Sequence, residues 1–166
     1  MMNTSKLAAL LALLAASSFA SMAYAQSATS QFEVGIEITS VCTFDIASTQ
    51  NVDFGQQASN LSNIDAAGQI GVVCTQDTPY AIELDNGENG ADVDSRAMAN
   101  GATLVPYQLY RNPARGPADV WGAIAGTVLS GTGSGSLQTL SVYGRVASAN
   151  FPAAVYDDVV TATVTY

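Results

Sequence analysis

Histidine is absent from all 166 residues, and cysteine occurs only twice. Without an imidazole, neither a Ser-His-Asp triad nor a Cys-His pair can be assembled, which excludes the common nucleophilic hydrolases. Zinc sites built from histidine and cysteine are excluded with them. Asp157 and Asp158 are adjacent on a predicted strand, so their carboxylates should point to opposite faces and not act together on a glycosidic bond. We therefore expect no catalytic activity, no metal and no cofactor.

Positive charge is almost as scarce. Lys6 is the only lysine, and residues 26–166 carry four arginines against 14 acidic residues, a formal charge of −10. Such a surface repels phosphate backbones and anionic lipid, so neither nucleic-acid binding nor stable membrane insertion is expected. The acidity keeps an exported protein soluble or allows it to bind a basic partner.

Long hydrophobic runs are missing except at the start. Lys6 precedes an apolar run at residues 7–16, and Ala23-Tyr24-Ala25 is a small-x-small cleavage site. These features predict a secretory signal peptide at residues 1–25, because the run is too short to span a bilayer. We expect export through the periplasm and a mature chain of residues 26–166, which suits one domain.

The two cysteines, Cys42 and Cys74, would then reach an oxidising compartment, where a disulfide between them is the default expectation.

A candidate metal site is the run 85–90, whose acids, amides and glycines resemble a calcium loop. Its twelfth position holds Arg96 instead of the bidentate glutamate that such a loop needs. This favours a solvated turn, and weak calcium binding through Asp92 and Asp94 stays open.

The body of the chain has short β-patterned runs and no long amphipathic helical period. Strands are expected at residues 70–75, 80–84, 104–110 and 137–146. Asn-Gly pairs at 86–87, 89–90 and 100–101 indicate turns, and the Gly/Ser-rich run 131–136 indicates a flexible loop. About seven short strands, one disulfide and the single Trp121 predict an all-β, immunoglobulin-like sandwich.

Both ends of the mature chain are also strand-like. In the tail, residues 156–166, one face of the strand carries Val160, Ala162, Val164 and Tyr166. In the head, residues 32–39, an apolar face alternates with a largely acidic face. The apolar face of the head carries Phe32, Val34, Ile36 and Ile38. The head is either an edge strand of a complete monomer or a strand added to a neighbour. Thr39-Ser40-Val41 has no Gly, Pro or Asn for a tight reversal, which favours the second interpretation.

The order and spacing of several short motifs resemble the spore coat U domain family, found in subunits of archaic chaperone/usher pili such as Csu-type pilins. The motifs are Val41-Cys42-Thr43, Val52-Asp53-Phe54-Gly55, the runs 71–75 and 80–84, Tyr107-Gln108-Leu109-Tyr110, Val120-Trp121-Gly122, the run 142–146 and the ending 156–166. One departure is Ala154, where such domains often have glycine.

The resemblance implies an incomplete immunoglobulin-like sandwich that lacks its last strand. A periplasmic chaperone supplies that strand first, and the head of the next subunit replaces it at an outer-membrane usher. The implied donor segment is residues 26–39, with Phe32, Val34, Ile36 and Ile38 as its inserted side chains. The implied pilin domain is residues 40–166, with the acceptor groove along Val160, Ala162, Val164 and Tyr166.

The expected product is a homopolymeric pilus at the cell surface that supports adhesion and biofilm formation. One domain fits a shaft or minor adaptor subunit better than a tip adhesin, which carries a second domain. Two alternatives stay open. A spore-coat or extracellular-matrix protein with the same domain would polymerise in the same way but act as a coat. A secreted carbohydrate-binding module would need exposed aromatic residues, for which Tyr107, Tyr110 and Trp121 are candidates.

Overall fold

The computed structural model describes residues 24–166, so the predicted signal peptide at 1–25 lies outside the described residues apart from Tyr24 and Ala25. The chain divides into two units, residues 1–37 and 38–166. In the described part of the first unit, residues 24–37, there is no helix or strand, and Phe32, Val34 and Ile36 are 85–87% exposed. The half-buried strand expected there is thus wrong for the single chain, because an isolated strand has no partner for its backbone.

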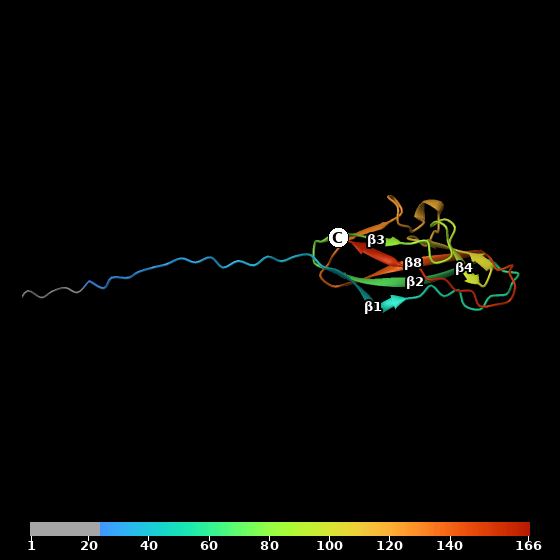
Figure 1. Cartoon of the computed structure of the whole chain (residues 1–166), viewed down its shortest axis with the longest axis horizontal. Helices are drawn as coiled ribbons and strands as arrows, with labels where there is room; N and C mark the ends of the chain where they lie inside the picture. The colour runs from blue at the N-terminus through green and yellow to red at the C-terminus, as the bar shows by residue number, and fades with distance from the viewer. Residues whose placement is uncertain (1–23) are drawn as a thin grey trace, which may run out of the picture. The chain divides into compact units, whose positions relative to one another are not determined.

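The second unit is a sandwich of antiparallel strands (Figure 1). The larger sheet has the order β1 (Cys42–Gln50), β2 (Ser62–Cys74), β8 (Leu137–Ser148) and β6 (Gln108–Tyr110). The other sheet has the order β7 (Leu129–Thr132), β3 (Pro79–Leu84) and β9 (Ala162–Thr165), while β4 (Ala97–Asn100) pairs with β5 (Thr103–Pro106). A single 3-10 turn, η1 (Pro117–Asp119), completes the elements of residues 24–166. The predicted all-β, immunoglobulin-like fold is confirmed. No helix within residues 24–166 is long and apolar enough to cross a membrane.

The core lies between the two sheets and follows the alternation of the strands. β2 and β8 are paired from Ser62–Ser148 to Val73–Leu137, which turns Ile70, Val72, Val142 and Val146 inward. Opposite them, β3 contributes Tyr80, Ile82 and Leu84, all buried. Trp121 has no exposed surface, and its Nε1 donates to the Ile82 carbonyl at 2.9 Å. The expected strands at 80–84 and 137–146 are therefore confirmed as parts of β3 and β8.

Other strand predictions differ from the structure. The run 70–75 falls mostly in the second half of β2, and the run 104–110 is divided at Tyr107 between β5 and β6, because β5 pairs with β4 whereas β6 pairs with β8. The expected loop 131–136 begins within β7. The tail forms a strand only at 162–165, because β3 ends at Leu84, which is opposite Ala162, and residues before 162 have no partner in this sheet.

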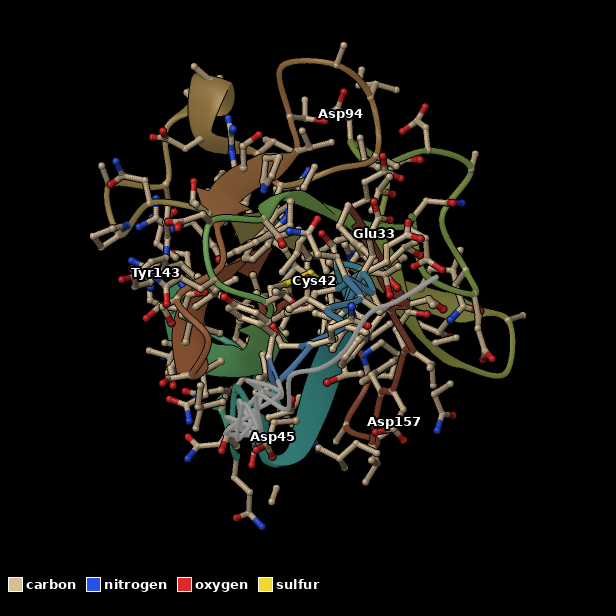
Figure 2. All side chains as sticks on the ribbon, turned by 90° about the vertical axis from the view of Figure 1, so that its left-hand side faces the viewer. Glu33, Cys42, Asp45, Asp94, Tyr143 and Asp157 are labelled. Carbon is tan, nitrogen blue, oxygen red and sulfur yellow. A yellow bond between two sulfur atoms is a disulfide. The ribbon has the colours of Figure 1, made fainter. Side chains whose placement is uncertain are left out.

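The disulfide between Cys42 and Cys74 is confirmed: it joins directly opposite residues of β1 and β2 that are 32 apart in sequence (Figure 2). Replacing both cysteines by serine is expected to lower the free energy of unfolding by about 3–4 kcal/mol, because the unfolded chain regains the entropy of an open loop. Urea unfolding monitored by Trp121 fluorescence measures this loss. Adding a reductant should lower the stability of the unaltered protein by the same amount and have no effect on the variant. The same urea midpoint for both proteins, with and without reductant, would contradict this prediction.

Candidate functional site

The two main sheets of the described chain end in four edge strands, β1 and β6 in the larger and β7 and β9 in the other, and β1 and β9 lie on the same border of the sandwich. β1 pairs only with β2, and β9 pairs only with β3, so each exposes a row of backbone donors and acceptors. The two edges belong to different sheets, yet β1 and β9 contact each other. Open edges are usually blocked or covered, because they pair readily with another chain. This side of the sandwich is therefore suited to accept a strand.

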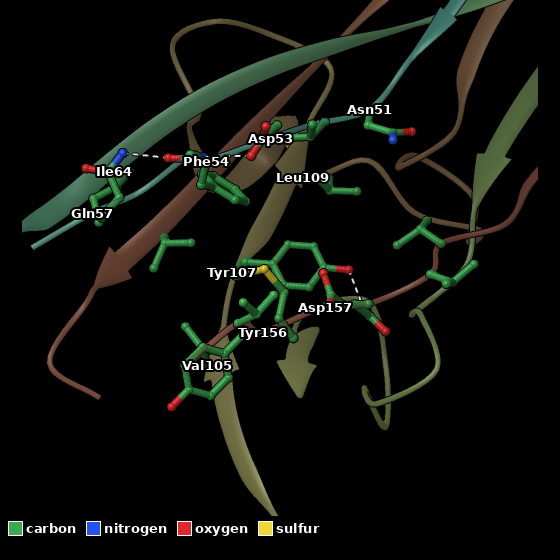
Figure 3. A pocket seen from close by; sticks show the side chains of 18 of the residues that line it. Asn51, Asp53, Phe54, Gln57, Ile64, Val105, Tyr107, Leu109, Tyr156 and Asp157 are labelled. Atoms are coloured by element: carbon green, nitrogen blue, oxygen red, sulfur yellow. Dashed lines mark hydrogen bonds between the residues drawn. The ribbon is translucent and has the colours of Figure 1, made fainter. Parts of the chain in front are cut away.

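Part of the same border is a groove that opens into the core, with a volume of about 1220 Å³ (Figure 3). Its floor is apolar and includes Ile70, Leu84, Leu109, Val142 and Val146. One wall is residues 49–57, which begin at the last two residues of β1, and the other is residues 149–160, which lie between β8 and β9. The volume exceeds the roughly 300–1,000 Å³ of ordinary small-molecule sites. A length of extended peptide matches it better, since successive side chains can reach the floor.

The predicted acceptor residues lie differently along this border. Val160 and Ala162 line the groove and pack against the core. Val164 packs against the core in β9 but is not part of the lining, and Tyr166 is 57% exposed. Thr161, Thr163 and Thr165 are exposed, as the alternation of the tail predicts. On the predicted donor face, the last residue, Ile38, belongs to the second unit and is 77% exposed.

The wall formed by residues 49–57 was not predicted from the sequence. Val52 and Phe54 turn inward there and pack against the core. They lie over Gly144 of β8, where an added Cβ would be 2.6 Å from Val52 Cγ1 and 2.8 Å from Phe54 Cζ. Glycine is therefore required at 144 for this close approach. The alternation Val52-Asp53-Phe54 was a usable signal, but only as a short inward-facing segment.

A polar group sits on the groove floor among these apolar residues. The Tyr107 hydroxyl donates to Asp158 Oδ2 at 2.6 Å, a bond drawn in Figure 3. Burial of the phenol, together with this carboxylate, raises the pKa of Tyr107, so it stays a neutral donor. Asp158 is half-buried and Asp157 is exposed, in agreement with opposite faces.

In the run 85–90 that resembles a calcium loop, the carboxylate of Asp85 accepts hydrogen bonds from backbone groups of the protein itself. Asp85 Oδ1 accepts from the backbone N–H of Gly87 at 3.0 Å and of Thr161 at 2.9 Å. Burial opposes the charge of Asp85, but these N–H donors outweigh it and hold the pKa of the carboxyl below its usual value. Asp92 and Asp94 are exposed, and residues 24–166 contain no cluster of three potential metal-ligating side chains.

Arg96, at the twelfth position of that run, is fully buried. Its guanidinium donates to the carbonyls of Leu84, Asp85 and Trp121 and to Gln108 Oε1, at 2.6–3.2 Å. Burial lowers the pKa of Arg96, and the nearby carboxylates of Asp85 and Asp158 oppose that shift. The side chain thus supplies hydrogen bonds to carbonyls that the strands leave unpaired.

The aromatic residues considered for sugar binding do not form an exposed platform. Trp121 and Tyr107 are buried, at 0% and 8% exposure, and Tyr110 is half-buried opposite Tyr143 of β8. A carbohydrate-binding module needs aromatic faces in contact with solvent. That alternative is therefore not favoured.

Comparison with known proteins agrees with this geometry. Residues 28–163 match the Spore Coat Protein U domain family. Among solved structures, the chain is similar to one in the crystal structure of the CsuC-CsuE chaperone-tip adhesion subunit pre-assembly complex from archaic chaperone-usher Csu pili of Acinetobacter baumannii. The identity is 23% and the TM-score 0.58, over 78% of this chain and 40% of that chain, a likeness that shows the fold. No protein with curated annotation matches.

Proposed function

Because the chain belongs to the Spore Coat Protein U domain family, we propose that it is a structural subunit of an archaic chaperone/usher pilus. In this proposal, each subunit inserts its head segment into the groove of the next copy. The groove side of one molecule and the head of another then form a single joint. Repetition of that joint produces a fibre.

The observation that carries the proposal is the complementarity of two unsatisfied features. The groove exposes an apolar floor beside the free edge of β9, and the described head segment exposes Phe32, Val34 and Ile36 without a strand partner. A strand added beside β9 would satisfy backbone groups while alternate side chains fill the groove. Burying four side chains of this size contributes roughly 6–12 kcal/mol per joint before ordering costs, enough for a persistent fibre.

The empty groove explains why a chaperone and an usher would be needed during export. An empty groove is an aggregation hazard, because its apolar floor and free strand edge can pair with any exposed strand. A periplasmic chaperone would cover it until an outer-membrane usher exchanges the chaperone for the next subunit. The similar solved structure is a pre-assembly complex of a chaperone with a tip adhesion subunit. We propose a place in the shaft or as a minor adaptor of a homopolymeric, adhesive surface pilus.

Electron microscopy of the mature protein, purified without a chaperone, tests this proposal. We expect thin filaments whose subunits do not separate on dilution. Excess synthetic peptide of residues 28–40 is the control, because it occupies grooves and should shorten the filaments. A monomer that unfolds cooperatively and forms no filament at any concentration would contradict the proposal.

A further inference from the structure

The groove wall that leads into β9 is not held by a β-sheet. At one end, Asp157 and Ala99 exchange backbone hydrogen bonds of 2.8 and 3.2 Å, and at the other end β9 begins at Ala162. Within the described chain, residues 158–160 make no backbone hydrogen bond to any other backbone group. Val160, which lines the groove, lies in this gap. Something other than strand pairing must therefore set the position of the wall.

Two carboxylates join this wall to the turn 85–90, in opposite directions. Asp158 Oδ1, on the wall, accepts from Glu88 N and Asn89 Nδ2, both at 2.9 Å. Asp85 Oδ1, on the turn, accepts from Thr161 N at 2.9 Å. We call Asp85 and Asp158 the carboxylate latch. The run that resembles a calcium loop thus uses its acid and amide groups to hold the wall.

The turn is itself anchored and shaped to receive the latch. The buried guanidinium of Arg96 holds the Asp85 carbonyl with two hydrogen bonds, of 2.9 Å from Nε and 2.6 Å from Nη2. Gly87 has a φ of 73°, and a Cβ at this position would overlap Asp158 Oδ2. Glycine is therefore needed there both for the turn and for the approach of Asp158. On the other side, Asp158 Oδ2 is tied to the groove floor through Tyr107.

An empty groove tends to close, because moving apolar wall residues such as Val160 and Tyr156 onto the floor removes surface from water. Three hydrogen bonds between the wall and the turn 85–90 oppose this movement, and the bond from Tyr107 fixes the distance between Asp158 and the floor. We propose that Asp158 and Asp85 are positioning residues that keep the groove open for the incoming strand. This inference rests on the proposed function and adds the residues that determine whether the groove is ready to accept a donor.

The test uses the full mature chain carrying Ile36→Asp, which removes its own donor, and a synthetic peptide of residues 28–40 as the probe. Adding Asp158→Ala should slow association of the peptide and weaken its binding by about tenfold or more. Asp158→Asn should restore most of the association rate, since an amide oxygen still accepts from Glu88 and Asn89. Asp94→Ala is the matched control, because Asp94 is an exposed aspartate outside the groove lining, and it should bind as the parent does.

The outcomes test the proposed function and the role of the carboxylate latch separately. If the parent protein does not bind the peptide, the proposed function fails. If the parent binds and Asp158→Ala binds at the same rate and affinity, the latch is overturned. Should Asp158→Ala fail to fold, Tyr107→Phe decides, because it removes one hydrogen bond and keeps the ring. It should show a smaller loss in the same direction, and unchanged binding would overturn the latch.

Discussion

Ile36→Asp is expected to abolish filament formation while leaving the subunit folded and able to accept a strand. Ile36 lies in the middle of the proposed donor face and is 85% exposed in the single chain, so the change costs the free subunit little. In a joint, however, it would bury an unpaired carboxylate on an apolar floor, a penalty of several kcal/mol. Negative-stain microscopy and sedimentation of the purified protein measure the outcome.

Two controls make this result specific. Glu37→Gln changes charge at the next residue, on the opposite face of the proposed donor strand, and should leave filaments of normal length. In mixtures with the unaltered protein, Ile36→Asp subunits can accept a donor but cannot provide one, so mean filament length should fall as their share rises. Normal filaments made by Ile36→Asp alone would remove the donor assignment.

Arg96→Met is expected to lower the free energy of unfolding by about 3–5 kcal/mol, because it keeps the packing volume and removes a fully buried donor group. Three backbone carbonyls and Gln108 Oε1 would lose a hydrogen bond in the interior. Since the turn 85–90 is anchored by this side chain, the loss should also expose the groove wall. Urea unfolding and amide hydrogen exchange at Thr161 measure the two effects.

Arg145→Met is the matched control for that change. Arg145 pairs with Asp65 at 2.7 Å on the surface, where solvent screens the ion pair and its contribution to stability is small. A small effect there, beside a large one at Arg96, would assign the loss to burial and not to net charge. Equal effects of the two substitutions would contradict the role given to Arg96.

The regular parts of the fold were predictable because a local pattern carries them. Buried and less buried residues alternate along 80–84, and β3 confirms both the predicted strand and the predicted pattern of burial. The first half of β2, by contrast, contains Ser62, Asn63, Asp65 and Gly68, which rarely form strands alone. Pairing with β8 makes it a strand. That pairing is a long-range contact, which a local pattern does not contain.

The groove was predictable on one side only. The alternation of the tail identifies the faces of β9, so Val160 and Ala162 could be named from the sequence. The other wall, with Val52 and Phe54, depends on a close approach to Gly144 more than eighty residues away. The buried Arg96 was noticed as a missing calcium ligand, and its partners come from three separate segments of the chain.

Composition and alternation alone established an acidic, all-β chain with one disulfide and two strand-like ends, because these properties depend on residue type and on neighbours two positions apart. The placement of the open edges, the depth of the groove and the latch on its wall depended on which distant segments meet. Hydrogen bonds such as Thr161 to Asp85 and Tyr107 to Asp158 join residues 76 and 51 positions apart, and only the packed sandwich brings those groups within reach.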